Sequence, residues 1–429
     1  MPSSSFRIVL GAAVPLLLSL SAGIVAQLLG TSLLGRHATA DLAAFALASA
    51  VLNPVNAAVA GGLRGLSPFA AACRERPAEA VAVLKDARWL ALALGSAGAC
   101  VMLAVPLIAR AGGAPEAAVA GLGALPALLA AQVLLSAAGG GAAGMLVALR
   151  HSGKVLWSGL AGTAAQVVLL LALVPPYGVP GTGVAMVAAT AVQVAVSNLL
   201  LRRLPELAGQ SWWPGRPRVR RIVRMAGVGL PLSATLIVKF TVMGGVAYAA
   251  ARTGVQQAAA HAILLSLDGF LGLAAASAAR AVTPEVARAT SAREARRLVV
   301  AAVTVGAAGV LAGGAALLVA GEAVLRLFTR DAAVLALASG LSPLLVGFAL
   351  ANGCAIVTAY GLVGQKRSTW QLAAVGTGYG LLALAVIPVS GTWGLAGLWA
   401  AMTATGALIW VLQITGFVRH SAAIAPAAA

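Results

Sequence analysis

The sequence predicts an all-α integral membrane protein, and three observations carry this prediction. Of its 429 residues, 61% are hydrophobic and only 9% are charged, whereas a soluble domain is about 45–50% apolar and about 25% charged. Long apolar runs recur along the chain, each able to cross about 30 Å of hydrocarbon as a helix. Lysine and arginine gather in alternate connecting segments, as in multi-pass proteins. Mean hydropathy is accordingly strongly positive, at +0.97.

The apolar runs define twelve predicted transmembrane helices. They span residues 8–33, 42–63, 88–109, 117–148, 155–174, 181–201, 225–251, 256–279, 298–320, 333–362, 369–388 and 395–418. The fourth and the tenth are longer than one span needs, so we expect a tilt or a kink in each, for which Pro126 and Pro343 are suitable.

The basic residues predict the orientation of these helices. With a cytoplasmic N-terminus, 23 of the 29 lysines and arginines lie in cytoplasmic segments, 5 lie outside, and Lys239 lies within a span. This asymmetry favours the cytoplasmic membrane, with both termini in the cytoplasm. It also accounts for the net charge of +18 by proximity to anionic headgroups, so we expect no nucleic-acid partner.

The sequence carries no sign of a catalytic or metal centre. Cys73, Cys100 and Cys354 are scattered and lack metal-ligand spacing. No zinc-protease helix motif, nucleophile elbow or pair of intramembrane carboxylates is present in the sequence. We therefore expect neither an enzyme nor a bound metal or cofactor.

The polar segment 202–224 divides the chain into two halves of six spans. The predicted domains are an N-terminal lobe (1–201), this basic cytoplasmic linker, and a C-terminal lobe (225–429). Since six is an even number, both halves have the same orientation. The lobes are then expected to be related by a pseudo-twofold axis along the membrane normal, with a cavity between them near the midplane.

Short repeats support this division. Residues 64–68 (RGLSP) recur as 280–284 (RAVTP), at an offset of 216. Residues 175–181 recur in their proline and glycine positions as 388–394, at an offset of 213. Architectures built from such repeats are typical of transporters.

Several local patterns resemble the multidrug and toxic compound extrusion (MATE) family, within the larger group of flippase-like exporters. In chain order, these patterns are LGTSLLGRHATADLAAFALAS (29–49), YGVPGTGVAMVAAT (177–190), GVGLPLS (227–233), QQAAAHAILLSL (256–267) and AYGLVGQKR (359–367). The resemblance extends over almost the whole chain. It implies two six-helix lobes, alternating access, and export of organic solutes against inward Na⁺ or H⁺ flow.

The chain departs from this family at three positions where members carry coupling carboxylates. The resemblance places Gly30 at the first-helix Asp, Lys239 at the seventh-helix Glu, and Asn352 at the tenth-helix Asp. A Na⁺ site needs hard oxygen ligands, and a lysine opposes it electrostatically. We therefore expect the proton motive force, rather than Na⁺, to drive transport.

Lys239 is the one basic residue placed deep in a span. It lies 14 residues from the cytoplasmic end of its run, or about 21 Å at 1.5 Å per residue, so it needs a partner. Asp268, in the next span at about 18 Å depth, is the expected one. The pair is a switch broken by protonation or by an anionic substrate, or a static pair that fixes packing, or the two groups make no contact.

Other polar groups in the spans complete the candidate site. His261 and Gln257 share a helix face with Asp268, and Thr235 precedes Lys239 by one turn. His261 is read as a third coupling residue beside Asp268 and Lys239. The predicted substrate-binding residues are Gln27, Asn53, Asn56, Thr235, Gln257 and Asn352, and Gln132, Gln166 and Gln193 are further neutral groups in the N-terminal half.

These expectations define one function and one alternative. The first is a monomeric secondary exporter of small neutral or anionic organic solutes, coupled to protons through Asp268 and Lys239. The alternative is a flippase for a lipid-linked saccharide or another anionic amphiphile, whose phosphate would suit a cationic cavity.

Overall fold

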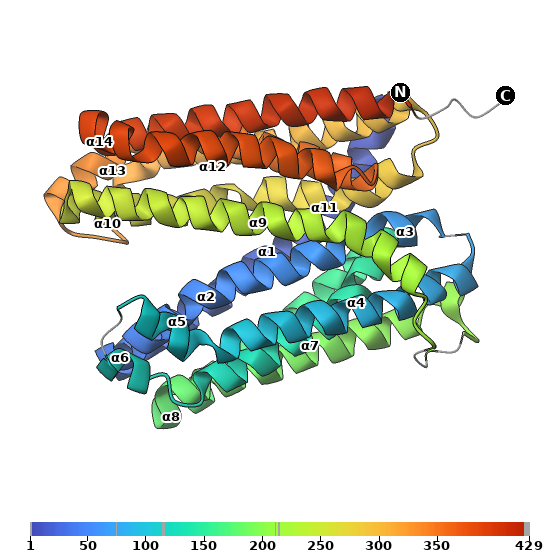
Figure 1. Cartoon of the computed structure of the whole chain (residues 1–429), viewed down its shortest axis with the longest axis horizontal. Helices are drawn as coiled ribbons and strands as arrows, with labels where there is room; N and C mark the ends of the chain where they lie inside the picture. The colour runs from blue at the N-terminus through green and yellow to red at the C-terminus, as the bar shows by residue number, and fades with distance from the viewer. Residues whose placement is uncertain (1, 74, 114–115, 211, 213–214, 424–429) are drawn as a thin grey trace. The chain divides into compact units, whose positions relative to one another are not determined.

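The computed structural model describes residues 2–73, 75–113, 116–210, 212 and 215–423, and over these residues the chain is helical (Figure 1). Because a membrane interior offers no water, each backbone amide must be bonded within its own segment, which selects helices from apolar runs of this length. The first seven are α1 (Pro2–His37), α2 (Thr39–Arg64), α3 (Ser67–Ala72), α4 (Pro77–Leu103), α5 (Val105–Ala111), α6 (Glu116–Ala120) and α7 (Leu125–Ala148). The rest are α8 (Ser152–Arg202), the 3₁₀ turn η1 (Pro205–Leu207), α9 (Val219–Thr253), α10 (Val255–Leu271), α11 (Leu273–Arg288), α12 (Ala292–Leu325), α13 (Ala332–Gly364) and α14 (Ser368–Ser421).

Twelve membrane-spanning segments arise from fewer continuous helices. Nine described helices are long and apolar enough to span, and α10 with α11 form a tenth span bent by 40°. α8 and α14 each contain a break, at Gly178 (φ 56°) and Gly394 (φ 58°), so each supplies two spans. The left-handed φ at both breaks favours glycine because a Cβ is strained there. The all-α, twelve-span prediction is confirmed.

The breaks correct one detail of the predicted repeat. Gly178 and Gly394 are the two glycines at which α8 and α14 turn. They lie 216 positions apart, the same offset as the RGLSP repeat, whereas the proline pattern aligned Gly178 with Gly391. Backbone conformation, rather than the nearest proline, therefore marks the equivalent positions.

The predicted span 117–148 is wrong at its start. A short helix, α6, and a turn through Gly123 (φ 46°) occupy its first part, and α7 begins only at Leu125. Pro126 lies in the first turn of α7 rather than within it, a position where its missing N–H costs nothing. Pro343, in contrast, lies inside α13 as expected.

The described residues group into two compact units. The N-terminal unit is Leu18–Ser233, and the C-terminal unit joins Met1–Leu17 to Ala234–Ala429. α1 and α9 thus contribute to both. The lobe boundaries at residues 201 and 225 stay a prediction.

The N-terminal unit has a core of fully buried leucine, valine and alanine side chains from α2, α4, α7 and α8, among them Leu125, Leu129 and Val133. At one crossing the backbones of α2 and α9 touch. A Cβ built on Gly229 would overlap the carbonyl group of Gly62. Glycine is therefore required at position 229 by the close approach of the two helices.

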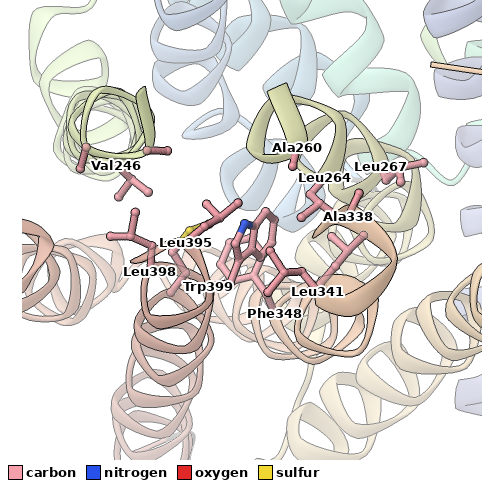
Figure 2. Packing of buried hydrophobic residues seen from close by; sticks show 14 of the residues in the cluster. Val246, Ala260, Leu264, Leu267, Ala338, Leu341, Phe348, Leu395, Leu398 and Trp399 are labelled. Carbon is pink, nitrogen blue, oxygen red and sulfur yellow. The ribbon is translucent and has the colours of Figure 1, made fainter. Parts of the chain in front are cut away.

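The C-terminal unit packs around Trp399 of α14, whose side chain is completely buried. Figure 2 shows the indole among Ala260 and Leu264 of α10 and Phe348 of α13. The Phe348 and Trp399 rings meet edge to face, with centroids 5.7 Å apart. This cluster fixes α14 against α10, which carries His261 and Asp268, and against α13, which carries Asn352.

Candidate functional site

Lys239 and Asn352 are brought together in the C-terminal unit. Lys239 is on α9 and Asn352 on α13, and the Lys239 Nζ donates a hydrogen bond to Asn352 Oδ1 at 3.2 Å. Both side chains are partly buried. The carboxamide oxygen thus accepts from an ammonium group that would otherwise be unpaired deep in an apolar helix. Two of the positions singled out by the family resemblance therefore contact one another.

The expected direct ion pair between Lys239 and Asp268 is not formed in the described chain. Lys239 bonds to Asn352 instead, and Asp268 Oδ1 is shielded from solvent without a hydrogen-bond partner among the described residues. The two charges nevertheless lie close enough to interact electrostatically. Similar depth along neighbouring helices placed the two groups near one another, but it did not determine which side chain Lys239 would contact.

Tyr379 completes this charged cluster, and it was not predicted from the sequence. It lies on α14, is 4% exposed, and is within electrostatic range of both Lys239 and Asp268. A tyrosine in the middle of a predicted span (369–388) is the signal that was available, because a buried phenol needs a polar neighbour. Its hydroxyl is a third polar group beside the lysine and the carboxylate.

His261 and Gln257 lie on α10, on the helix face predicted for them. The His261 ring is 2% exposed and packs edge to face on Trp399, with centroids 5.7 Å apart. Neither His261 nitrogen, nor Gln257 Oε1, has a hydrogen-bond partner within the described chain. Thr235, also predicted, is buried on α9 one turn before Lys239. These groups share the C-terminal unit with Lys239.

A second polar site lies inside the N-terminal unit. It is a cavity of about 180 Å³ whose lining includes Gln27, Asn53, Asn56, Gln166 and Thr182. All three substrate-binding residues predicted for this half therefore meet in one place. Asn56 Nδ2 lies 3.5 Å from Gln132 Oε1, a long hydrogen bond. Thr182 was not predicted; its hydroxyl donates to the carbonyl oxygen of Gly178, next to the break in α8.

The N-terminal cavity is uncharged. Its lining residues are all neutral, and Gly30, the position where the resemblance places an acid, is one of them. Amide and hydroxyl groups such as these both donate and accept hydrogen bonds. The cavity can therefore bind a polar solute without requiring that it carry a positive charge.

Comparison with known proteins shows what this architecture is similar to. The MatE family model matches residues 225–389. A probable multidrug resistance protein NorM from Aromatoleum aromaticum is 28% identical over 376 residues, covering 80% of this chain and 78% of the relative. These findings confirm the family resemblance seen in the sequence motifs.

Solved structures of similar proteins share the fold. One is an outward-facing multidrug resistance MATE family transporter of the MOP superfamily, with a TM-score of 0.87 and 18% identity, covering 98% of this chain and 96% of the other. Another is a MOP superfamily transporter from Pyrococcus furiosus, with a TM-score of 0.83, 18% identity and the same coverage of both chains. At these identities the likeness establishes the fold alone.

Proposed function

We propose that this chain is a secondary active exporter of small organic solutes that works by alternating access, because residues 225–389 match the MatE family model. The relative from Aromatoleum aromaticum is described as a probable multidrug resistance protein, which supports efflux. The distribution of lysine and arginine supports a place in the cytoplasmic membrane with both termini in the cytoplasm. On this proposal the protein is a transporter, not an enzyme, and works as a monomer.

Proton coupling through Asp268 and Lys239 is the proposed energy source. The observation that carries it is the position of Lys239, bonded to Asn352 at 3.2 Å and within electrostatic range of Asp268. With Asp268 ionised, the ammonium group has two competing partners. Protonation of Asp268 removes one, so Lys239 is then held by Asn352 on α13. Exchange of Lys239 between the two partners would couple the proton to the packing of α9, α10 and α13.

A neutral or anionic solute fits the polar groups better than an organic cation does. Gly30, Lys239 and Asn352 stand where the resemblance places three carboxylates, and the N-terminal cavity is lined by neutral residues. The Pyrococcus furiosus transporter is described as having a binding pocket of reverse polarity that suggests a different function. Lys239 stands where the resemblance places an acid, which supports a similar reversal of charge in the binding region of this chain.

Transport into proteoliposomes under an imposed pH gradient tests the proposal. The panel comprises anionic, neutral and cationic solutes, with a phospholipid-flip assay as a separate arm for the flippase alternative. We expect neutral or anionic solutes to be taken up, and this uptake to stop when the pH gradient is dissipated. In Asp268→Asn the rate of uptake should no longer depend on the gradient, and in Lys239→Ala uptake should be reduced. Glu322→Gln, a change at an exposed acid near the end of α12, is the control and should behave like the wild type.

Two results would contradict specific parts of the proposal. Unchanged transport in both Asp268→Asn and Lys239→Ala would end the coupling role of the pair. Flipping of lipid without movement of any soluble solute would replace the exporter by the flippase.

A further inference from the structure

A second, larger cavity lies at the start of α12. Its volume is about 630 Å³, and its lining includes Phe6 of α1 and Arg293, Arg296, Arg297 and Val300 of α12. All of these residues belong to the C-terminal unit. The charge distribution predicts that this end of α12 faces the cytoplasm. The cavity therefore lies where a membrane-spanning helix leaves the hydrocarbon.

The lining residues of α12 form one face of the helix. Arg293, Arg297, Val300 and Thr304 follow one another at spacings of four, three and four, the spacing that aligns side chains on an α-helix. Arg296 belongs to the same face, three positions after Arg293 and four before Val300. The first turns of this face are basic, and the following turns carry a valine, an alanine and a threonine. One surface thus changes from cationic to largely apolar along the direction into the membrane.

The positive charge of this face is not neutralised by the described part of the chain. Arg293 and Arg297 are exposed and form no ion pair there. Glu294, the acid in the first turn, caps the start of the helix instead. Its Oε2 accepts from the backbone nitrogen of Thr290 at 2.9 Å and from the Thr290 hydroxyl at 3.0 Å. The N-terminal end of a long helix adds further positive potential.

Arg296 is held in position at the centre of the basic turns. Its Nε donates to Ser421 Oγ at 2.9 Å, and its Nη2 donates to the carbonyl oxygen of Val418 at 3.0 Å. Both partners are uncharged, so they orient the guanidinium without neutralising it. Because its orientation is fixed before binding, less side-chain entropy is lost when an anion binds.

The walls next to the basic turns are apolar and exposed. Phe6 is 41% exposed and Val300 is 64% exposed. On α1, exposed apolar side chains continue one turn apart, at Leu10 (39%) and Val14 (45%). A ligand for this site therefore has an anionic end and a hydrocarbon part, rather than being a free inorganic anion.

We propose that this cavity binds the phosphate headgroup of an anionic phospholipid, with an acyl chain lying along the exposed faces of α1 and α12. Guanidinium groups bind phosphate oxygens through two parallel hydrogen bonds, and basic pockets at the cytoplasmic ends of helices are suited to anionic headgroups. The site is separate from the transport function proposed above and does not depend on it.

Ligand-dependent stabilisation of the purified, delipidated full chain in detergent tests this site. The probes are dioctanoyl phosphatidylglycerol, dioctanoyl phosphatidylcholine at equal concentration, and inorganic phosphate, with thermal unfolding as the readout. Only phosphatidylglycerol should raise the melting temperature of the wild type in a saturable way. The double variant Arg293→Ala/Arg297→Ala should bind it roughly 25-fold more weakly, at about fivefold per basic residue near an anionic group.

Two further variants keep the test decisive. Arg203→Ala/Arg367→Ala removes two exposed arginines elsewhere and should bind like the wild type. Val300→Trp keeps every charge but fills the open wall, and should also weaken binding. Equal binding of phosphatidylglycerol by all variants would overturn the site. Stabilisation by inorganic phosphate equal to that by phosphatidylglycerol would overturn the assignment to a lipid.

Discussion

At the residue scale, Lys239 shows what could and could not be predicted from sequence. Its depth in an apolar run predicts that it needs a partner, and charge and similar depth favour Asp268. The actual acceptor is Asn352, more than a hundred positions along the chain. Depth within neighbouring helices is readable from sequence, but the rotation of α13 against α9 is set by tertiary packing.

Asn352→Asp should stabilise the protein and impair transport. The new carboxylate would stand at the Lys239 ammonium, and a hydrogen bond to a charged group contributes about 1.5–3 kcal/mol. That pair would hold Lys239 on α13 and so oppose its exchange with Asp268. We expect a higher melting temperature and slower gradient-driven uptake.

Asn352→Leu is the opposite change, because it leaves the ammonium without its acceptor. Loss of a buried partner costs about 1–3 kcal/mol, so the melting temperature should fall. A double-mutant cycle with Lys239→Ala isolates the pairwise contribution. If the effects of Asn352→Leu and Lys239→Ala simply add, the two side chains do not interact in the way described.

At the element scale, apolar runs predicted which helices exist better than where they begin. The stretch 117–124 is as apolar as the helix that follows it, so composition merged the two, although Pro126 is a first-turn proline and Gly123 takes a positive φ. The turns at Gly178 and Gly394 were expected as loops, yet each is a one-residue break in otherwise helical backbone. Such breaks depend on a single φ angle, which composition does not report.

The contact between α2 and α9 gives a prediction for glycine in a helix. Gly229→Ala places a methyl group against the carbonyl of Gly62, and overpacking of this kind costs about 1–3 kcal/mol. Gly227→Ala is the matched control, because no atom lies near its Cβ position. There alanine should be neutral or stabilising by up to about 1 kcal/mol through helix propensity. The melting temperature should fall in Gly229→Ala and should be unchanged or higher in Gly227→Ala. Equal melting temperatures of the two variants would argue against the close approach.

At the scale of the whole molecule, the orientation in the membrane stays a prediction from the lysine and arginine pattern. Cys73, just after α3, lies in a segment predicted to be cytoplasmic, whereas Cys354 is buried and Cys100 lies within α4. A membrane-impermeant maleimide should therefore label the protein in inside-out vesicles and not in right-side-out ones. Cys73→Ser should abolish the label. Labelling from the other side would reverse the topology.

The pH dependence of that labelling adds a second check. Burial raises the pKa of the Cys73 thiol, and the nearby Glu79 carboxylate raises it further. The thiolate is the reactive form, so labelling should be slow at neutral pH and accelerate at higher pH than for an ordinary cysteine. Glu79→Gln removes a charge that opposes the thiolate, so its rate profile should shift to lower pH. An unchanged profile would mean that Glu79 does not act on the thiol.

The C-terminal unit joins the first residues of the chain to its second half, and this has a consequence for how the protein is made. Val9 is fully buried in a cluster with Ala275, Leu298 and Phe417, side chains that leave the ribosome only after most of the chain has been synthesised. The first helix must therefore stay in the translocon or the lipid, with Val9 unpacked, until the last helices have been synthesised. Nascent chains arrested before α12 should keep this segment accessible to cross-linking, and full-length chains should not.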